Sequence, residues 1–148
     1  HTWRLLQTPP APGAWNMAVD EAILQAVAAG DAPPTVRLYA WRPACLSLGY
    51  FQPIEDADAY ACARHGVDLV RRPTGGSAIL HDDELTYSVI APENNPLVSG
   101  DILTSYRKIA AALAVGLRNL GVSVELANSP QRYRDGEMGG WTDGEIAG

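Results

Sequence analysis

The segment DLVRRPTGGSAILHDDELTYSVI, residues 68–90, decides which fold the sequence predicts. Strand-like residues lie on both sides of the Gly75-Gly76 pair, at 68–72 and at 78–81, and a third strand-like run, 84–92, follows a polar corner. Adjacent strands joined by such short turns are typical of antiparallel or mixed sheets. The segment therefore favours a mixed, largely antiparallel sheet over a strictly alternating parallel fold.

The other elements are predicted from apolar periodicity and from residues that mark helix ends. In the first helix, Asn16 stands where a capping residue is expected, and Asp20 and Glu21 lie near the positive end of the helix dipole. Asp101 is the expected cap of the last helix. The fold class is therefore α/β (α+β), with helices flanking the sheet. Further strands are predicted at 3–6, 33–41, 45–53 and 122–127, and helices at 16–30, 55–65 and 100–121.

The composition indicates one globular domain. Of the 148 residues, 47% are hydrophobic and 19% are charged, which is ordinary for such a domain. The net charge of −6 disfavours nucleic-acid binding, which normally needs a basic surface. No apolar run approaches the roughly 18 residues of a membrane span, and the start of the chain lacks a signal-peptide pattern. We therefore expect a cytoplasmic protein with no nucleic-acid or membrane partner.

The cysteines and the end of the chain carry further expectations. Cys45 and Cys62 are too few and too far apart for a zinc site, so we predict no metal site and reduced thiols. Lys108 is the only lysine among eleven basic residues. Residues 132–148 are rich in glycine and have no apolar period. We predict a folded domain over 1–131, followed by a divergent tail over 132–148.

The Gly75-Gly76 pair and the arginines before it favour a ligand site. Glycines let a ligand approach the backbone closely, so that N–H groups can bind an anion. Successive strand residues point to opposite faces, so only one of Arg71 and Arg72 faces the glycines. Its guanidinium offers a fork for a carboxylate or phosphate. The small side chain of Ala78 leaves room for a slender group such as an acyl chain.

The same residues also fit a purely structural interpretation. Two glycines between strands often form only a tight turn. His81, at a strand end, is often a structural residue held by hydrogen bonds. The acidic run 82–84 is expected to be a solvated turn, with no geometry for a mechanism that uses two carboxylates. Both interpretations stay open at the level of the residues.

Several motifs together resemble one protein family. VRRPTGGSAILHDDELTYSV is similar to the RR-x-(S/T)-GG-x-A-x-x-H signature of the lipoate–protein ligase and octanoyltransferase family. NMAVDEAIL and PTVRLYAWRPACLSLGYFQ agree with the family in order and spacing. The resemblance runs from about Trp3 to about Ala127. It implies the biotin/lipoate ligase-like catalytic domain, a mixed sheet flanked by helices, for residues 1–131, as an incomplete copy.

Within the family, HDDELTYSV resembles the octanoyltransferases that use a cysteine acyl-enzyme. The resemblance implies transfer of octanoyl from acyl carrier protein, through a cysteine thioester, to a lysine of a lipoyl domain such as that of the glycine cleavage H protein. No cofactor is implied. One alternative is an ATP-dependent lipoate–protein ligase, which would use ATP and Mg. Another is a non-catalytic fragment or pseudoenzyme that binds an acyl group or a carrier domain.

The resemblance also implies which residues bind the substrate, whereas the catalytic residues stay unknown. The family's cysteine lies in an Ala-Cys-Phe segment and its lysine in a Lys-x-x-Gly segment, and neither occurs in these 148 residues. Cys45, Cys62 and Lys108 do not match them. We therefore expect the chain to be inactive or impaired by itself. The residues expected to line the acyl or acyl-adenylate pocket are Arg72, Thr74, Gly75, Gly76, Ser77, Ala78 and His81.

Overall fold

A computed structural model describes residues 2–126 of the chain. The chain forms two compact units, which divide between Gly100 and Asp101. The first unit contains every strand found among the described residues, and the second contains one long helix. The segment 132–148 lies outside the described residues, so its assignment as a divergent tail and the domain boundary at 131 stay predictions.

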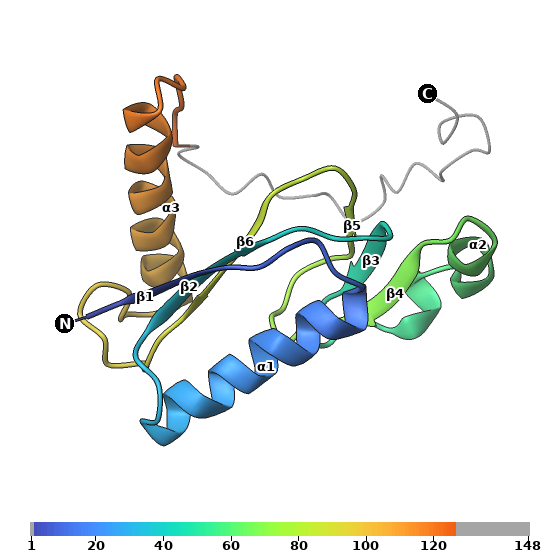
Figure 1. Cartoon of the computed structure of the whole chain (residues 1–148), viewed down its shortest axis with the longest axis horizontal. Helices are drawn as coiled ribbons and strands as arrows, with labels where there is room; N and C mark the ends of the chain where they lie inside the picture. Colours follow the sequence, from blue (N-terminus) through green and yellow to red (C-terminus); the bar gives the residue numbers. More distant parts are fainter. Residues whose placement is uncertain (1, 127–148) are drawn as a thin grey trace. The chain divides into compact units, whose positions relative to one another are not determined.

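The strands of the first unit form two three-stranded sheets (Figure 1). They are β1 (Arg4–Gln7), β2 (Thr35–Tyr39), β3 (Cys45–Leu48), β4 (Asp68–Arg71), β5 (Ile79–His81) and β6 (Thr86–Ile90). In the first sheet, β2 pairs parallel with β1 and antiparallel with β6. In the second, β3 pairs parallel with β4 and antiparallel with β5. The predicted mixed α/β class is confirmed, with two sheets in place of one and an even balance of parallel and antiparallel pairs.

The helical segments begin and end close to the predicted positions. They are α1 (Gly13–Ala29), the short 3₁₀ segment η1 (Ile54–Asp56), α2 (Ala59–Arg64) and α3 (Ile102–Asn119). The single helix predicted at 55–65 is divided because Ala57 has extended backbone angles. Asp58 then caps α2, since its Oδ1 accepts a hydrogen bond from the Ala61 N–H at 2.8 Å. None of the described helices combines the length and the apolar composition that crossing a membrane requires.

Helix α3 begins as predicted, but the strand predicted after it is absent. Asp101 Oδ1 accepts a hydrogen bond from the Thr104 N–H at 2.7 Å, which is the expected cap. Residues 122–126 form no strand. Within this unit the described residues offer no neighbouring strand for a ladder, and a lone strand is not stable. The Val124 carbonyl instead accepts a hydrogen bond from Arg118 Nη2 at 2.9 Å.

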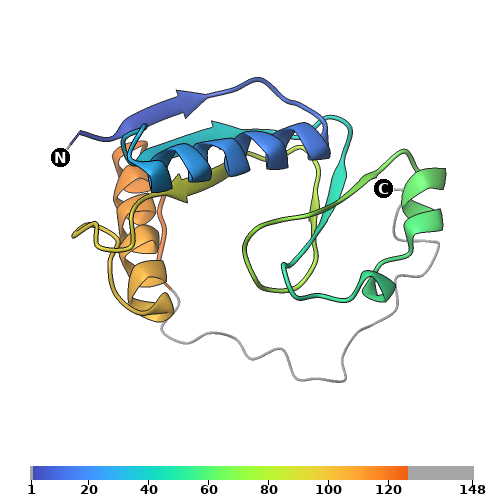
Figure 2. The same cartoon turned by 90° about the horizontal axis from the view of Figure 1, so that it is seen from below.

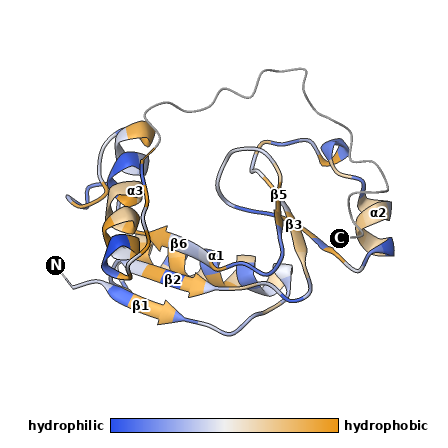
Figure 3. Ribbon diagram, turned by 90° about the horizontal axis from the view of Figure 1, so that it is seen from above, coloured by the Kyte–Doolittle hydropathy of each residue, from blue (hydrophilic) through white to orange (hydrophobic). Residues whose placement is uncertain are grey.

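Helix α1 packs along the first sheet, and its first turn reaches the second sheet (Figure 2). Ile23 and Val27 form a core cluster with Ile90 of β6. Figure 3 shows that apolar residues occupy much of β2 and β6. At the other end of the helix, the Gly13 N–H donates a hydrogen bond of 2.8 Å to Asp68 Oδ2, at the start of β4. Helix α1 therefore connects the two sheets.

The start of α1 differs from the prediction. The helix begins at Gly13, three residues before Asn16. Its N-cap residue is Pro12, whose side chain accepts no hydrogen bond. The distant Asp68 takes that role. A Cβ atom at Gly13 would lie 2.6 Å from Cys45 Sγ, which is closer than real Cβ contacts. Glycine is therefore the residue that lets the helix start against the second sheet.

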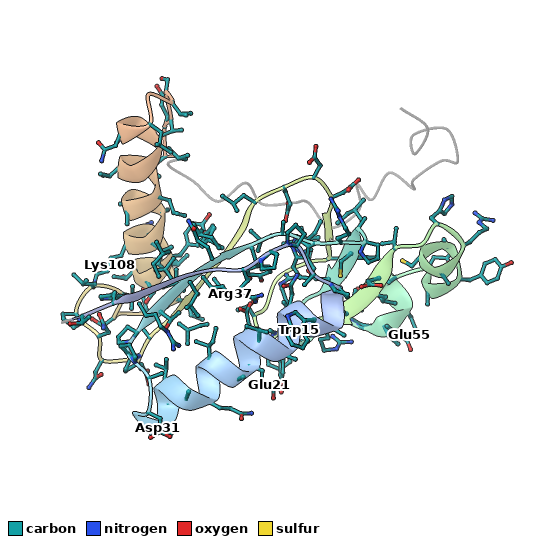
Figure 4. All side chains as sticks on the ribbon, in the orientation of Figure 1. Trp15, Glu21, Asp31, Arg37, Glu55 and Lys108 are labelled. Atoms are coloured by element: carbon teal, nitrogen blue, oxygen red, sulfur yellow. The ribbon has the colours of Figure 1, made fainter. Side chains whose placement is uncertain are left out.

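Asn16, predicted as a cap, and Asp20, predicted near the positive end of the helix dipole, belong to a buried polar cluster around Arg37. Figure 4 labels the position of Arg37. Arg37 is fully buried and forms an ion pair with Asp20, Nη1 to Oδ1, at 2.8 Å. Its Nη2 donates to Asn16 Oδ1 at 2.8 Å. The Tyr39 hydroxyl donates to Asp20 Oδ2 at 2.9 Å. Burial, followed by the Asp20 carboxylate, raises the pKa of Tyr39.

We call Thr8, Asn16, Asp20, Arg37 and Tyr39 the Arg37 cluster. Every guanidinium N–H direction of Arg37 has an acceptor, because Nε and Nη2 also donate to Thr8 Oγ1 and Nη1 also donates to the Asn16 carbonyl. A buried charge is tolerated only when it is paired and hydrogen-bonded in this way. The cluster thus fixes α1 on β2.

Candidate ligand-binding site

The predicted site is a loop that runs from the end of β4 to the start of β5. It lies against the chain that leaves β3, where the Tyr50 N–H donates a hydrogen bond of 2.9 Å to the Thr74 carbonyl. A Cβ atom built on Gly49 would lie 1.8 Å from the Gly76 carbonyl oxygen, so this contact requires glycine. Gly76 has a φ of +95°, a conformation that glycine adopts without strain. We call residues 72–77 the glycine loop.

Arg72 holds the glycine loop through its two terminal nitrogens. Nη2 donates to the carbonyls of Gly75 and Ser77, both at 2.8 Å. Nη1 donates to the Ser47 carbonyl at 2.9 Å and to Ser47 Oγ at 3.2 Å. Partial burial lowers the pKa of the Arg72 guanidinium from its ordinary value. The four contacts tie the loop to the middle strand of the second sheet.

Arg71 points elsewhere, as strand alternation predicts. Its Nη1 donates to the carbonyls of Gly49, Tyr50 and Gln52 at 2.7, 3.1 and 2.6 Å. Arg71 thus closes the turn after β3, whereas Arg72 contacts the glycine loop. The sequence predicted that the Arg72 guanidinium would bind a carboxylate or phosphate of a ligand. In the structure, all four hydrogen bonds of its Nη atoms go instead to oxygens of the protein.

His81 is buried at the end of β5, and both of its ring nitrogens have protein partners. Nε2 lies 2.8 Å from Ser47 Oγ, and Nδ1 lies 2.5 Å from Glu84 Oε1. The ring stacks on Trp41, with centroids 4.3 Å apart and planes inclined by 15°. The sequence left open whether His81 is a structural residue held by hydrogen bonds. Its contacts in this structure are of that kind.

Glu84 adds specific contacts to the solvated turn that was expected at 82–84. Asp82, Asp83 and Glu84 are all exposed, but Glu84 Oε1 also accepts a hydrogen bond from the Thr86 hydroxyl at 2.7 Å and contacts the His81 ring. Partial desolvation opposes ionisation of Glu84. The hydrogen bonds from His81 and Thr86 outweigh it and lower the pKa of that carboxyl. Glu84 is therefore a carboxylate acceptor within the site.

The structure gathers the predicted site residues on one loop and strand. Thr74, Gly75, Gly76 and Ser77 are exposed, Arg72 and Ala78 are half-buried, and His81 is buried behind them. The sequence analysis missed Ser47, Glu84 and Trp41, which surround His81. Ser47 carried a weak signal, because it lies in an alternating strand among apolar neighbours, where a buried hydroxyl needs a partner.

The two cysteines do not provide a reactive thiolate. Burial raises the pKa of the Cys45 thiol to about 12, with a further contribution from Asp68. Burial, followed by Asp58, also raises the pKa of Cys62. The thiolate is the nucleophilic form, so neither group is activated at neutral pH. Among the residues that the structure describes, no cluster of three or more His, Cys, Asp or Glu side chains could hold a metal ion.

Comparison with known proteins places these features in a family. Residues 12–144 match the family profile described as "Lipoyl protein ligase A/B catalytic domain". Octanoyltransferase LipM of Moorella thermoacetica is 53% identical over 135 residues, which are 90% of this chain and 50% of that protein. The chain spans about half the length of the curated relatives it matches.

Solved structures give the same answer for the fold. A bipartite lipoate protein ligase from Thermoplasma acidophilum, described together with its E2 lipoyl domain, has a TM-score of 0.69 and 29% identity, over 84% of this chain and 48% of that one. A lipoate-protein ligase A bound with ATP has a TM-score of 0.70 and 30% identity, over 88% of this chain and 53% of that one. The predicted family is confirmed, and this chain belongs to the lipoyl protein ligase A/B catalytic domain family.

Proposed function

We propose that the glycine loop and β5 bind the acyl group in an octanoyltransferase reaction. In this reaction octanoyl passes from acyl carrier protein to a lysine of a lipoyl domain, such as that of the glycine cleavage H protein, in the cytoplasm. The 53% identity with an octanoyltransferase supports this choice of acyl group. The solved relative described with an E2 lipoyl domain supports the choice of acceptor.

One observation carries the proposal, the direction in which Arg72 turns the peptides of the glycine loop. The carbonyls of Gly75 and Ser77 point at Arg72 Nη2. In a trans peptide the N–H of the next residue points the opposite way, and these peptides are trans. The N–H groups of Gly76 and Ala78 therefore point away from Arg72. Two such donors suit an anionic or carbonyl oxygen of an acylated ligand.

The apolar part of the ligand would lie along β5. Ala78 and Leu80 share one face of the strand, because residues two apart point to the same side. Leu80 keeps half of its surface exposed, as does its neighbour Ile79. An octanoyl chain that covered such surface would gain about 25 cal/mol for each Å² removed from water. The small Ala78 leaves the start of this path open beside the two N–H groups.

The proposed chemistry needs a thiol that Cys45 and Cys62 do not supply. A cysteine thiolate attacks the octanoyl thioester carbonyl, the bond from that carbonyl to the pantetheine sulfur breaks, and the pantetheine thiol leaves. The lysine amine of the acceptor then attacks the enzyme thioester, forming an amide and freeing the thiol. Both cysteines of this chain have raised pKa values. We therefore propose that this chain supplies the acyl-binding part of the site and is inactive or severely impaired by itself. No cofactor enters this reaction.

Two measurements test the proposal on the 148-residue chain. Titration with octanoyl-pantetheine should give saturable binding, and no binding would overturn the acyl site. Incubation with octanoyl-acyl carrier protein and a lipoyl domain should leave the mass of the lipoyl domain unchanged. Efficient octanoylation of its lysine would overturn the proposed impairment while leaving the acyl site intact.

A second candidate is an ATP-dependent lipoate ligase, which the similarity to a ligase bound with ATP supports. That reaction would use ATP and Mg, and the glycine loop would then hold an acyl-adenylate. Release of pyrophosphate when lipoate and ATP are added together would favour this candidate. Binding of octanoyl-pantetheine with neither pyrophosphate release nor transfer would leave a protein that binds without catalysis.

A further inference from the structure

One continuous chain of hydrogen bonds ends at the glycine loop. It runs through the side chains of Glu84, His81, Ser47 and Arg72. Glu84 Oε1 lies 2.5 Å from His81 Nδ1, and His81 Nε2 lies 2.8 Å from Ser47 Oγ. Ser47 Oγ then accepts from Arg72 Nη1 at 3.2 Å. Arg72 Nη2 in turn holds the Gly75 and Ser77 carbonyls. A change at Glu84 can therefore reach the loop through three fixed side chains.

Proton counting assigns a direction to this chain. Arg72 can only donate, so Ser47 Oγ accepts one of its N–H groups. Ser47 Oγ can still donate its hydroxyl hydrogen to His81 Nε2 or accept from it, so this contact alone does not place the ring proton. The Glu84 carboxylate only accepts, so the hydrogen of that contact lies on His81 Nδ1, and in the neutral ring Nε2 then accepts from Ser47. Each contact thus contains one hydrogen and one acceptor.

The opposite tautomer of His81 would break this pattern at Glu84. With the proton on Nε2, the unprotonated Nδ1 would face an acceptor-only carboxylate at 2.5 Å. Hydrogen bonds from His81 and Thr86 lower the pKa of Glu84, so a protonated carboxyl does not rescue that contact near neutral pH. The carboxylate therefore selects the Nδ1–H tautomer, in which the Ser47 hydroxyl donates to Nε2 and accepts from Arg72.

Glu84 is itself held in place by the residues that hold His81. The Thr86 hydroxyl donates to Glu84 Oε1 at 2.7 Å and accepts from Trp41 Nε1 at 2.7 Å. Trp41 in turn stacks on the His81 ring. These four side chains close a ring of contacts, so the imidazole can neither rotate nor translate easily. Such support is what a residue needs in order to set the geometry of another.

We propose that Glu84 is a positioning residue, which fixes the Nδ1–H tautomer of His81 and, through Ser47, orients Arg72 and the N–H groups of the glycine loop. The proposal rests on the function proposed above only in assuming that this loop binds the acylated ligand. It assigns roles to Glu84 and Ser47, and it makes His81 an internal link of the site.

The test uses the 148-residue chain and three variants, together with a fourth that serves only to assign the His81 signal. Glu84→Ala removes the acceptor. Glu84→Gln keeps a carbonyl oxygen at the same place and is the conservative rescue. Asp82→Ala, an exposed neighbour that meets no histidine in the structure, is the matched control. The first readout is the two-bond ¹H–¹⁵N spectrum of the histidine rings, in which His81 is identified by its loss in a His81→Gln variant.

In the unsubstituted chain, His81 should show a protonated Nδ1 and an unprotonated Nε2. Glu84→Gln and Asp82→Ala should keep this tautomer, whereas Glu84→Ala should shift His81 toward Nε2–H and move the amide signals of Gly75 and Gly76. An unprotonated Nδ1 in the unsubstituted chain would overturn the proposal, even if Glu84→Ala did not fold. So would a Glu84→Ala spectrum unchanged in both His81 and the loop.

The second readout is the affinity for octanoyl-pantetheine. Glu84→Ala should weaken binding by about threefold to tenfold, the effect of losing one hydrogen bond, and Glu84→Gln should restore it. Equal weakening by Ala and Gln would overturn the proposed route through the tautomer. If no variant binds, and neither does the unsubstituted chain, the proposed function fails while the spectra still decide the role of Glu84.

Discussion

Two arginines organise the first unit, and their surroundings differ in burial and in charge pairing. Arg37 is fully buried and has a carboxylate partner in Asp20, together with neutral acceptors from Thr8 and Asn16. Arg72 is half-buried and has four neutral oxygen acceptors. Within the described part of the chain, no carboxylate forms an ion pair with Arg72. The charge of Arg37 is neutralised locally, whereas that of Arg72 is not.

This difference distinguishes a structural cluster from a candidate binding site. A charge paired in the interior stabilises one arrangement of helix and sheet and has no capacity left for a ligand. An uncompensated guanidinium beside exposed backbone keeps a positive potential that an oxygen-rich ligand can use. The glycine loop thus combines a fixed geometry with a positive charge with which no described carboxylate of the protein pairs.

The largest expected effect comes from removing the partner of the buried arginine. Asp20→Ala leaves the Arg37 charge buried and unpaired, which should lower the free energy of unfolding by about 3–5 kcal/mol. Urea denaturation followed by circular dichroism measures this change. Glu21→Ala, at the exposed next position of the same helix, is the control and should change stability by less than about 0.5 kcal/mol. A small effect of Asp20→Ala would mean that the Arg37 cluster is not a structural ion pair.

At the other arginine the main effect should be on binding. Arg72→Ala removes the contacts to Gly75 and Ser77 and releases the glycine loop. We expect affinity for octanoyl-pantetheine to fall by about tenfold to a hundredfold, as for hydrogen bonds to a charged group. Isothermal titration measures it. Arg71→Ala is the matched control, since the side-chain hydrogen bonds described for Arg71 go to the turn at 49–52, and it should cost much less affinity. Equal losses would show that the two arginines do not have separate roles.

The contrast between the arginines also explains how far the sequence could be read. Alternation along the strand was enough to predict that only one of Arg71 and Arg72 faces the glycines, because strand geometry is local, and the family resemblance implied that it is Arg72. The cap at Asp101 was predictable for the same reason. The burial of Arg37 was not, since an arginine that alternates with apolar residues is usually assigned to the solvent side of a strand. Its inward direction depends on Asp20, which is 17 residues away.

Other failures have the same cause. Asn16 matched a capping pattern, but the side chain that caps α1 is Asp68, which is 55 residues from Gly13 along the chain, and Gly13 permits the close contact. The contact between Glu84 and His81 was missed, because His81 is identified as buried only once β5 pairs with β3. Local sequence pattern thus predicted the helices, most strands and the glycine loop. Contacts between distant segments determine which polar side chains are buried and which residues hold the site in place, so the pattern did not predict these.

A smaller effect is expected where the two sheets are connected. Asp68→Ala removes the acceptor of the Gly13 N–H and leaves the start of α1 without a side-chain cap. The loss of a cap typically costs about 1 kcal/mol, so the urea midpoint should fall by less than for Asp20→Ala. Asp68→Asn keeps an oxygen for this hydrogen bond and should recover part of the loss. Full stability of Asp68→Ala would show that α1 does not need this contact.

The mildest probe leaves both arginines and the fold intact and compares the two cysteines. Cys45 is fully buried beside the packed start of α1, and burial raises its thiol pKa to about 12. A raised pKa lowers the thiolate fraction at pH 8, and burial also keeps the reagent away from the sulfur. Cys45 should therefore react with a disulfide reagent at least about tenfold more slowly than the partly exposed Cys62. Stopped reactions analysed by peptide mass spectrometry separate the two sites, and unfolding in urea should abolish the difference. Rapid labelling of Cys45 in the folded chain would mean that the contact between α1 and the second sheet opens readily, and that the helix is held mainly on the first sheet, by the Arg37 cluster and the apolar contacts of Ile23 and Val27.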